Sequence, residues 1–203
     1  MNKYPIKYLF RDDWDYQNYE QNTTNMYREI VQRDWVTFDC GARDGYFTLL
    51  FSELGRECHS FEPSNNFSVL TKNIEHYNLQ DKVKINNLAL SDKVGSFSET
   101  IYESWPLPTT KIYNFTTIDR YVLDNKLDKV DLIKIDCDSF ELDILRGCIK
   151  TLWALSPVVV VELNSQALGL RNTHIGAVKH FLAEQGYSEI RQSEENSTFK
   201  KLL

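Results

Sequence analysis

Acidic side chains follow two apolar segments of the chain and are the first candidates for chemistry. Asp136 and Asp138 come after VDLIKI, and Glu162 ends PVVVVE. A carboxylate within reach of a hydroxyl can accept its proton, so these residues are candidate general bases. Asp136 is the first choice and Glu162 the second. His174, at the start of a predicted helix, is a further candidate, but a lone histidine is more often a surface or packing residue.

Asp138 also fits a structural role. The stretch Asp138-Ser139-Phe140-Glu141 has the pattern of a helix capping box, in which Glu141 stands three residues after the cap. We therefore expect Asp138 and Glu141 mainly to stabilise the start of a helix. The three carboxylates of Asp136, Asp138 and Glu162 offer the oxygen ligands that a hard divalent cation prefers. Nothing in their spacing requires a metal, and we expect none.

A glycine-containing loop follows the apolar run VTFDC. It reads Asp39-Cys40-Gly41-Ala42-Arg43-Asp44-Gly45, and Arg43 stands where a dinucleotide-binding G-x-G-x-x-G loop needs its second glycine. The pattern suits a cofactor with a zwitterionic amino-acid tail, because Asp39 can bind an ammonium while loop amides bind a carboxylate. A tight strand-to-helix turn without a ligand would use the same glycines.

Glu62 ends the second predicted strand, in the sequence SFEP. In nucleotide-binding α/β domains an acid at this edge of the sheet accepts the hydroxyls of a ribose. Glu62 therefore strengthens the prediction of a nucleoside cofactor. The alternative is a solvated charge at the strand end, with Ser64 capping the next helix.

Apolar strand-like runs alternate with segments of helical period, which must position these residues. The predicted strands are 36–40, 57–62, 82–90, 130–137 and 157–164, and the predicted helices are 45–54, 66–79, 116–125, 139–153 and 173–186. Runs such as VVVVEL are typical of strands buried on both faces. The fold class is therefore α/β, a doubly wound and mostly parallel sheet with helices on both faces. YSEIRQ and STFKKLL predict an antiparallel edge hairpin.

Length and composition bound the remaining possibilities. The 203 residues suit one domain, which we place at 35–203, with the aromatic-rich residues 1–34 as a helical extension packed on it. No apolar run is long enough to span a membrane, and the N-terminus lacks the features of a secretory signal, so we expect a cytoplasmic protein. A net charge of −6 argues against a nucleic-acid partner. The four cysteines lack zinc-site spacing and read as reduced, buried thiols.

Several segments together resemble the FkbM family of methyltransferases, over about residues 35 to 165. They are VTFDCGARDGYFTLLFSELG, SFEPSNNFSVLTKNIEHYNL, NNLALSD, DLIKIDCDSFELDILRG and VVVVELN. The resemblance implies a Rossmann-like class I methyltransferase fold, S-adenosylmethionine as cofactor and O-methylation of a hydroxyl. It also implies the cofactor-binding residues: Asp39, Gly41, Ala42, Gly45 and Thr48 for the methionine end, Glu62 for the ribose, and Asn87, Leu88 and Ala89 for the adenine. Pro63, next to Glu62, is counted with the cofactor-binding residues.

The chain departs from the family pattern at two places. Arg43 stands where the family tends to have Asn, and Asp138-Ser139 where it tends to have Glu-Gly. The second change leaves open an altered or inactive site.

We expect an O-methyltransferase that acts on a hydroxyl of a small molecule, most plausibly a sugar of a glycan or of a glycosylated metabolite. The stretch Trp105-Pro106-Leu107-Pro108 follows the third strand, where an aromatic side chain can stack on a sugar ring. One alternative is a non-catalytic domain of a larger glycan-building enzyme, in which the chain would be part of a longer multidomain protein. A nicotinamide-dependent oxidoreductase is another alternative, against which Arg43 argues.

Overall fold

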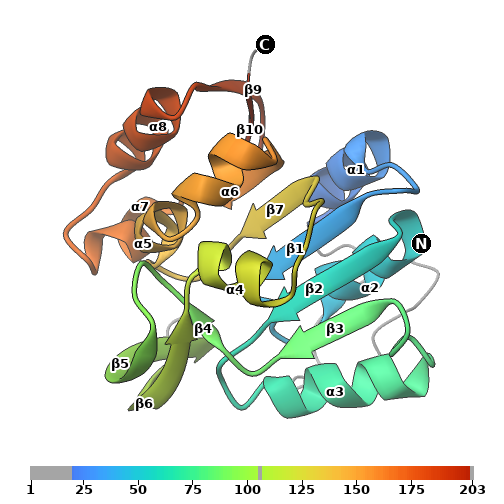
Figure 1. Cartoon of the computed structure of the whole chain (residues 1–203). Coiled ribbons are helices and arrows are strands. Elements are labelled where there is room, and N and C mark those ends of the chain that lie inside the picture. The colour runs from blue at the N-terminus through green and yellow to red at the C-terminus, as the bar shows by residue number, and fades with distance from the viewer. Residues whose placement is uncertain (1–19, 105–106, 202–203) are drawn as a thin grey trace.

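The computed structural model describes residues 20–104 and 107–201. In this part of the chain, seven strands form one sheet in the order β3-β2-β1-β7-β8-β10-β9 (Figure 1). The strands are β1 (Val36–Cys40), β2 (Glu57–Phe61), β3 (Val83–Asn86), β7 (Leu132–Ile135), β8 (Val158–Glu162), β9 (Tyr187–Ser193) and β10 (Asn196–Lys201). The first five pair in parallel, and β10 is antiparallel to both β8 and β9. The predicted α/β fold is confirmed, and β10 lies inside the sheet while β9 forms its edge.

Helices cover both faces of this sheet. They are α1 (Gln21–Ile30), α2 (Tyr46–Leu54), α3 (Phe67–His76), α4 (Ile118–Asp124), α5 (Glu141–Arg146), α6 (Ile149–Ala154), α7 (Ser165–Gly169) and α8 (Ile175–Glu184). Alternate residues of one strand point to opposite faces, so Val160 packs with α2 and α3 in one hydrophobic cluster while Val159 and Val161 pack in the other. This is why the strand VVVVE is apolar without interruption.

The predicted helix 139–153 is two short helices, α5 and α6, that meet at Gly147. A Cβ atom at residue 147 would lie 2.1 Å from the backbone oxygen of Ser91, so only glycine allows this close approach. The predicted strand 82–90 is likewise divided, into β3 and the short β4 (Ala89–Leu90).

A hairpin that the hydrophobic pattern did not predict follows β4. It consists of β5 (Gly95–Ser104) and β6 (Leu107–Thr116), and it joins β4 in a second sheet of order β4-β6-β5. Its strands carry many Ser and Thr residues, and one face is exposed, with Ile112 71% accessible while Phe115 is buried. The Trp105-Pro106 part of the predicted stacking stretch lies outside the described residues.

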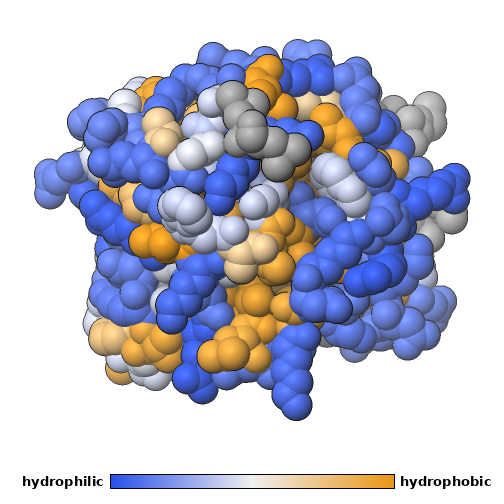
Figure 2. Space-filling model, turned by 45° about the horizontal axis from the view of Figure 1, so that its top comes forward, coloured by the Kyte–Doolittle hydropathy of each residue, from blue (hydrophilic) through white to orange (hydrophobic). Residues whose placement is uncertain are grey.

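The described part of the N-terminal extension is α1 and the loop after it. Met26 and Tyr27 of α1 are buried against α2. No helix among the described residues is long and apolar enough to cross a membrane. Large apolar side chains remain exposed on α4 and α6, among them Leu123 and Trp153. Figure 2 shows hydrophobic residues gathered in the middle of the face that it presents.

Candidate active site

A cavity of about 280 Å³ opens at the carboxyl ends of β1, β2, β7 and β8. This is the edge at which parallel α/β sheets bind their ligands. Of the predicted site residues, those that line it are Gly41, Ala42, Glu62, Pro63, Leu88, Ala89, Asp136, Asp138 and Glu162. Those that do not line it are Asp39, Gly45, Thr48, Asn87 and His174. The hairpin contributes Ile101, Tyr102 and Phe115 to the same cavity.

A buried lysine that was not among the predicted site residues lies at the base of the cavity. Lys134 of β7 pairs in register with Asp39 of β1, and its Nζ lies 3.1 Å from Asp39 Oδ1 and 3.4 Å from Asp136 Oδ2. Thr48 donates a hydrogen bond to the other oxygen of Asp39, at 2.6 Å. Burial lowers the pKa of Lys134, but the two carboxylates outweigh it and hold the pKa well above its ordinary value. The charge of Asp39 is therefore balanced by Lys134 inside the protein.

We expect Lys134→Met to destabilise the protein by about 3 to 5 kcal/mol, because it leaves the fully buried Asp39 carboxylate unpaired. Replacing both partners, as in Asp39→Asn with Lys134→Met, removes the charge along with its partner and should recover most of that loss. Urea denaturation of the two proteins measures the difference. Equal stability of the single and the double variant would show that the pair does not carry this energy.

The carboxylates of Asp138 and Glu162 lie close enough to Asp136 for its charge to raise their pKa values. Asp136 raises the pKa of Glu162 to about 10, with burial adding to the effect, so Glu162 is protonated at neutral pH and shares a hydrogen bond with Asp136. Burial, followed by the charge of Asp136, raises the pKa of Asp138 to about 7. Among the described residues, no three His, Cys, Asp or Glu side chains are placed to hold a metal ion.

Glu62 holds two loops together at the edge of the cavity. Its carboxylate accepts hydrogen bonds from the backbone N–H groups of Arg43 and Ser64, both at 2.8 Å, and burial raises its pKa. The exposed Asn87 donates to the backbone oxygen of Glu62 at 2.9 Å. The N-cap of α3 is Asn66, and Ser64 Oγ accepts a hydrogen bond from the backbone N–H of Asn66 at 3.1 Å. Glu62 therefore lines the cavity as a buried, oriented carboxylate and is not a solvated strand-end charge.

The loop amides that were expected to bind a carboxylate are already used. The N–H groups of Gly41 and Ala42 both donate to the backbone oxygen of Phe61, at 3.1 and 3.0 Å. The first turn of α2 lies beyond them, and its residues Tyr46 and Phe47 line the cavity. A helix N-terminus of this kind favours an anionic group.

His174 lies outside the cavity. It is the N-cap of α8, and its Nδ1 accepts a hydrogen bond from the backbone N–H of Ala177 at 3.2 Å. Its position therefore gives it a helix-capping role.

Comparison with known proteins identifies the family. A family model described as the methyltransferase FkbM domain matches residues 39–189. The chain belongs to the FkbM family of methyltransferases. No curated protein matches the sequence.

Solved structures share the fold at low sequence identity. A methyltransferase FkbM from Methylobacillus flagellatus matches with a TM-score of 0.58 and 14% identity, over 87% of this chain and 49% of that chain. TrmK from M. capricolum, in complex with S-adenosylhomocysteine, matches with a TM-score of 0.54 and 10% identity, over 88% and 67% of the two chains. A Streptococcus mutans protein, also in complex with S-adenosylhomocysteine, matches with a TM-score of 0.55 and 10% identity, over 90% and 97%. The chain thus spans about half the length of the first of these proteins.

In this FkbM protein the departure at Asp138-Ser139 forms a strained turn at the cavity. Asp138 has φ 45° and Ser139 has φ 104°, a region that favours glycine. Helix α5 begins only at Glu141, and no side chain caps it, so the predicted capping role of Asp138 is wrong. The left-handed turn takes Asp138 away from the helix, and its side chain lines the cavity instead. Glu141 does reach back as predicted, and it accepts hydrogen bonds from the N–H groups of Cys137 and Ser139.

Ser139→Gly should stabilise the protein by about 1 kcal/mol, because glycine adopts a positive φ without strain. The hydrogen bond from the N–H of residue 139 to Glu141 does not involve the serine side chain and should persist. Ser52→Gly is the control, since residue 52 lies inside α2 and glycine there should cost about 1 kcal/mol. Thermal denaturation compares the two; a loss of stability in Ser139→Gly would contradict the strain.

Proposed function

We propose that this FkbM methyltransferase uses S-adenosylmethionine to methylate a hydroxyl of a small molecule, most plausibly a sugar of a glycan or a glycosylated metabolite. One observation carries the proposal: Glu62 and the carboxylates of Asp136, Asp138 and Glu162 line the same cavity at the ligand-binding edge of the sheet. Two proteins with the same fold hold S-adenosylhomocysteine, the product of such a transfer. When bound, S-adenosylmethionine supplies an electrophilic methyl group.

The cavity fits the parts of this cofactor. Each oxygen of Glu62 accepts one backbone N–H and retains capacity for a ribose hydroxyl. Leu88 and Ala89 give an apolar surface for the adenine, and the first turn of α2 favours the carboxylate of the methionine end. Because Asp39 is paired with Lys134, we assign the ammonium to Asp136, which lines the cavity and has a partly exposed side chain.

Proton removal from the acceptor falls to a carboxylate of the same cluster. Asp136 was the first choice on position, but its side chain pairs with Lys134 and is assigned above to the ammonium of the cofactor. Asp138 caps no helix, lines the cavity and has a pKa of about 7, close to the value that suits a general base at neutral pH. We therefore propose Asp138 as the base, while protonated Glu162 donates its hydrogen bond to Asp136.

The setting of the activity is also part of the proposal. The matched Methylobacillus flagellatus protein is about twice as long as the aligned region, which supports a place for this domain in a longer chain. All four cysteines are free thiols, which supports a reducing compartment such as the cytoplasm.

We expect the purified protein to bind S-adenosylhomocysteine, and Glu62→Ala to weaken this binding by roughly 2 kcal/mol, the value of hydrogen bonds to a charged group. Isothermal titration calorimetry measures both proteins. Glu189→Ala is the control, because residue 189 is also a partly buried glutamate but does not line the cavity. A folded wild-type protein that binds no S-adenosylhomocysteine at high micromolar concentration would refute the cofactor assignment.

We expect Asp138→Asn to lower turnover about a hundredfold, the usual contribution of a positioned base. Wild-type turnover should rise as the pH increases through about 7, where Asp138 loses its proton. Asp136→Asn should instead weaken S-adenosylhomocysteine binding. Transfer of a labelled methyl group to a sugar panel measures turnover. If Asp136→Asn binds cofactor normally but does not turn over, while Asp138→Asn is active, the base is Asp136.

Asp138→Asn should also change the way in which the stability of the protein depends on pH. The folded-state pKa of Asp138 is about 7, above its unfolded value of 3.8, so the stability that this carboxyl contributes at low pH is lost as the pH rises to about 7. Asparagine has no such loss. The melting temperature of Asp138→Asn relative to wild type should therefore increase between these two pH values and stay constant above them.

A further inference from the structure

The β5–β6 hairpin forms one wall of the cavity but has few backbone connections to the rest of the protein. Ile101, Tyr102 and Phe115 line the cavity from this hairpin. Its strands pair with each other, and only β6 pairs further, with the two residues of β4. Figure 1 shows the hairpin beside the main sheet and not within it. The position of its cavity wall therefore depends on side-chain contacts.

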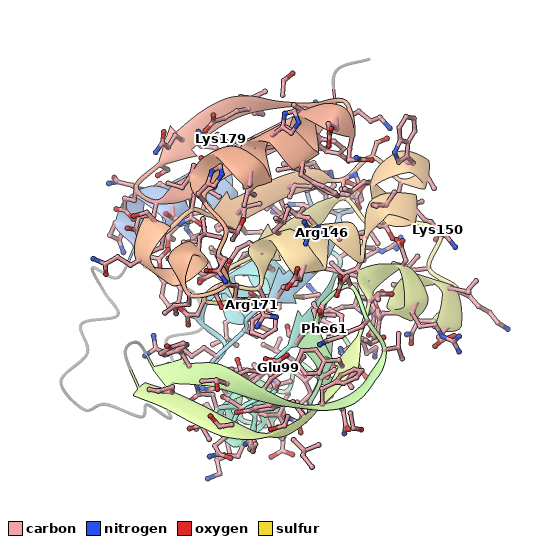
Figure 3. The ribbon with its side chains drawn as sticks, turned by 90° about the vertical axis from the view of Figure 1, so that its left-hand side faces the viewer. Phe61, Glu99, Arg146, Lys150, Arg171 and Lys179 are labelled. Carbon is pink, nitrogen blue, oxygen red and sulfur yellow. The ribbon has the colours of Figure 1, made fainter. Side chains whose placement is uncertain are left out.

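Arg171, in the loop between α7 and α8, makes three contacts that join this hairpin to the body of the protein. Its Nη1 lies 3.4 Å from Glu99 Oε2 of β5, and its Nε lies 3.2 Å from Asp143 Oδ2 of α5. The guanidinium also lies 4.0 Å from the ring centroid of Phe140, which lines the cavity. Figure 3 shows Arg171 between α5 and the strand that carries Glu99. These side chains are only 21 to 28% exposed, so solvent screens their charges less than at an open surface.

A second set of contacts leads from Glu99 back to Phe140 through the hairpin. Lys93 Nζ lies 3.4 Å from Glu99 Oε1 and 4.5 Å from the ring centroid of Phe97. Phe97 contacts Phe115 at 5.9 Å between ring centroids, and Phe115 contacts Phe140 at 6.0 Å. Glu99 thus contacts both Arg171 and Lys93. The aromatic contacts from Phe97 through Phe115 to Phe140 join the hairpin to the body of the protein a second time, at the cavity wall.

We propose that Arg171 is a positioning residue that ties the β5–β6 hairpin to α5 through Glu99, and so sets the width of the cavity on the side of Ile101 and Tyr102. This rests on the proposed function in one respect, that the cavity receives the acceptor. The neutral acceptor then meets a wall whose position is fixed by charges outside the cavity.

Cys137 allows a test that needs no known acceptor. It is the cysteine that lines the cavity, whereas Cys40, Cys58 and Cys148 are fully buried elsewhere. The probe is methyl methanethiosulfonate, and peptide mass spectrometry measures the rate at which each cysteine reacts. The variants are Glu99→Gln and Arg171→Gln. The matched control is Glu189→Gln, which breaks the Lys179–Glu189 ion pair between α8 and β9, away from the cavity.

We expect Cys137 to react about fivefold faster in Glu99→Gln and Arg171→Gln than in wild type, as the loss of a partly exposed ion pair implies. The rate in Glu189→Gln should be unchanged. Amide hydrogen exchange of β5 and β6 should also be faster in the two variants. Unchanged Cys137 and hairpin rates in both variants would overturn the proposal. So would equal acceleration at Cys40, Cys58 and Cys148, since this indicates general destabilisation.

Two further measurements separate this proposal from the proposed function. S-adenosylhomocysteine should slow the reaction of Cys137, and its affinity should stay within about twofold in all variants. If it does not slow the reaction, the cofactor assignment is contradicted. The Cys137 rates measured without ligand then still test whether Arg171 and Glu99 hold the hairpin. With methyl β-D-glucopyranoside as acceptor, Glu99→Gln should raise KM about fivefold with little change in kcat. An unchanged KM overturns the positioning role, whereas no transfer by wild type contradicts the sugar assignment alone.

Discussion

The structure depends on one buried charge pair, Lys134 with Asp39. The two residues face each other across the central strands β1 and β7, and their side chains are 3% and 0% exposed. Each charge would be costly alone, so the register of these strands is fixed by the need to keep the charges together. Lys134 also donates to the backbone oxygen of Gly41 at 3.2 Å and thereby holds the loop that borders the cavity. The base of the site is thus set by an ion pair within the protein, in which Lys134 lines the cavity.

Three further carboxylates, those of Asp136, Asp138 and Glu162, line the cavity near this pair and outnumber its single lysine. Lys134 lies closest to Asp39 and then to Asp136. At Asp138 the charges of Arg43 and Lys134 lower the pKa, but burial and Asp136 outweigh them, and at Glu162 Asp136 and burial raise the pKa. Their raised pKa values follow from this, since burial and the neighbouring Asp136 disfavour further negative charge. The strained turn at Asp138 and Ser139 lies at the same place. Strain and perturbed titration cluster at functional sites, where the surrounding fold supports them.

Much of this arrangement could be predicted from sequence, and the failures have separate physical causes. Strand β1 was predicted residue for residue, because its β-branched and aromatic residues are bounded by a polar segment before it and a glycine-containing loop after it. The hairpin was missed because one of its faces is exposed and its pattern is polar. The role of Asp39 could not be inferred from its own loop, because its partner Lys134 stands far along the chain. The two residues are brought together only by the pairing register of β1 and β7. A lysine inside the apolar run LIKI was the available signal.

Asp138 shows how a local pattern can be satisfied in part and still mislead. Glu141 does bond backwards to the chain, as a capping box requires, but it binds the N–H groups of Cys137 and Ser139 while residue 138 turns left-handed toward the cavity. The turn frees a carboxylate whose pKa is near 7 and places it beside Asp136. An acceptor with its own negative charge would be repelled by this site, where the pKa values of Asp138 and Glu162 are already raised. A neutral hydroxyl adds no charge, so the electrostatics of the cavity support the neutral acceptor and the base proposed above.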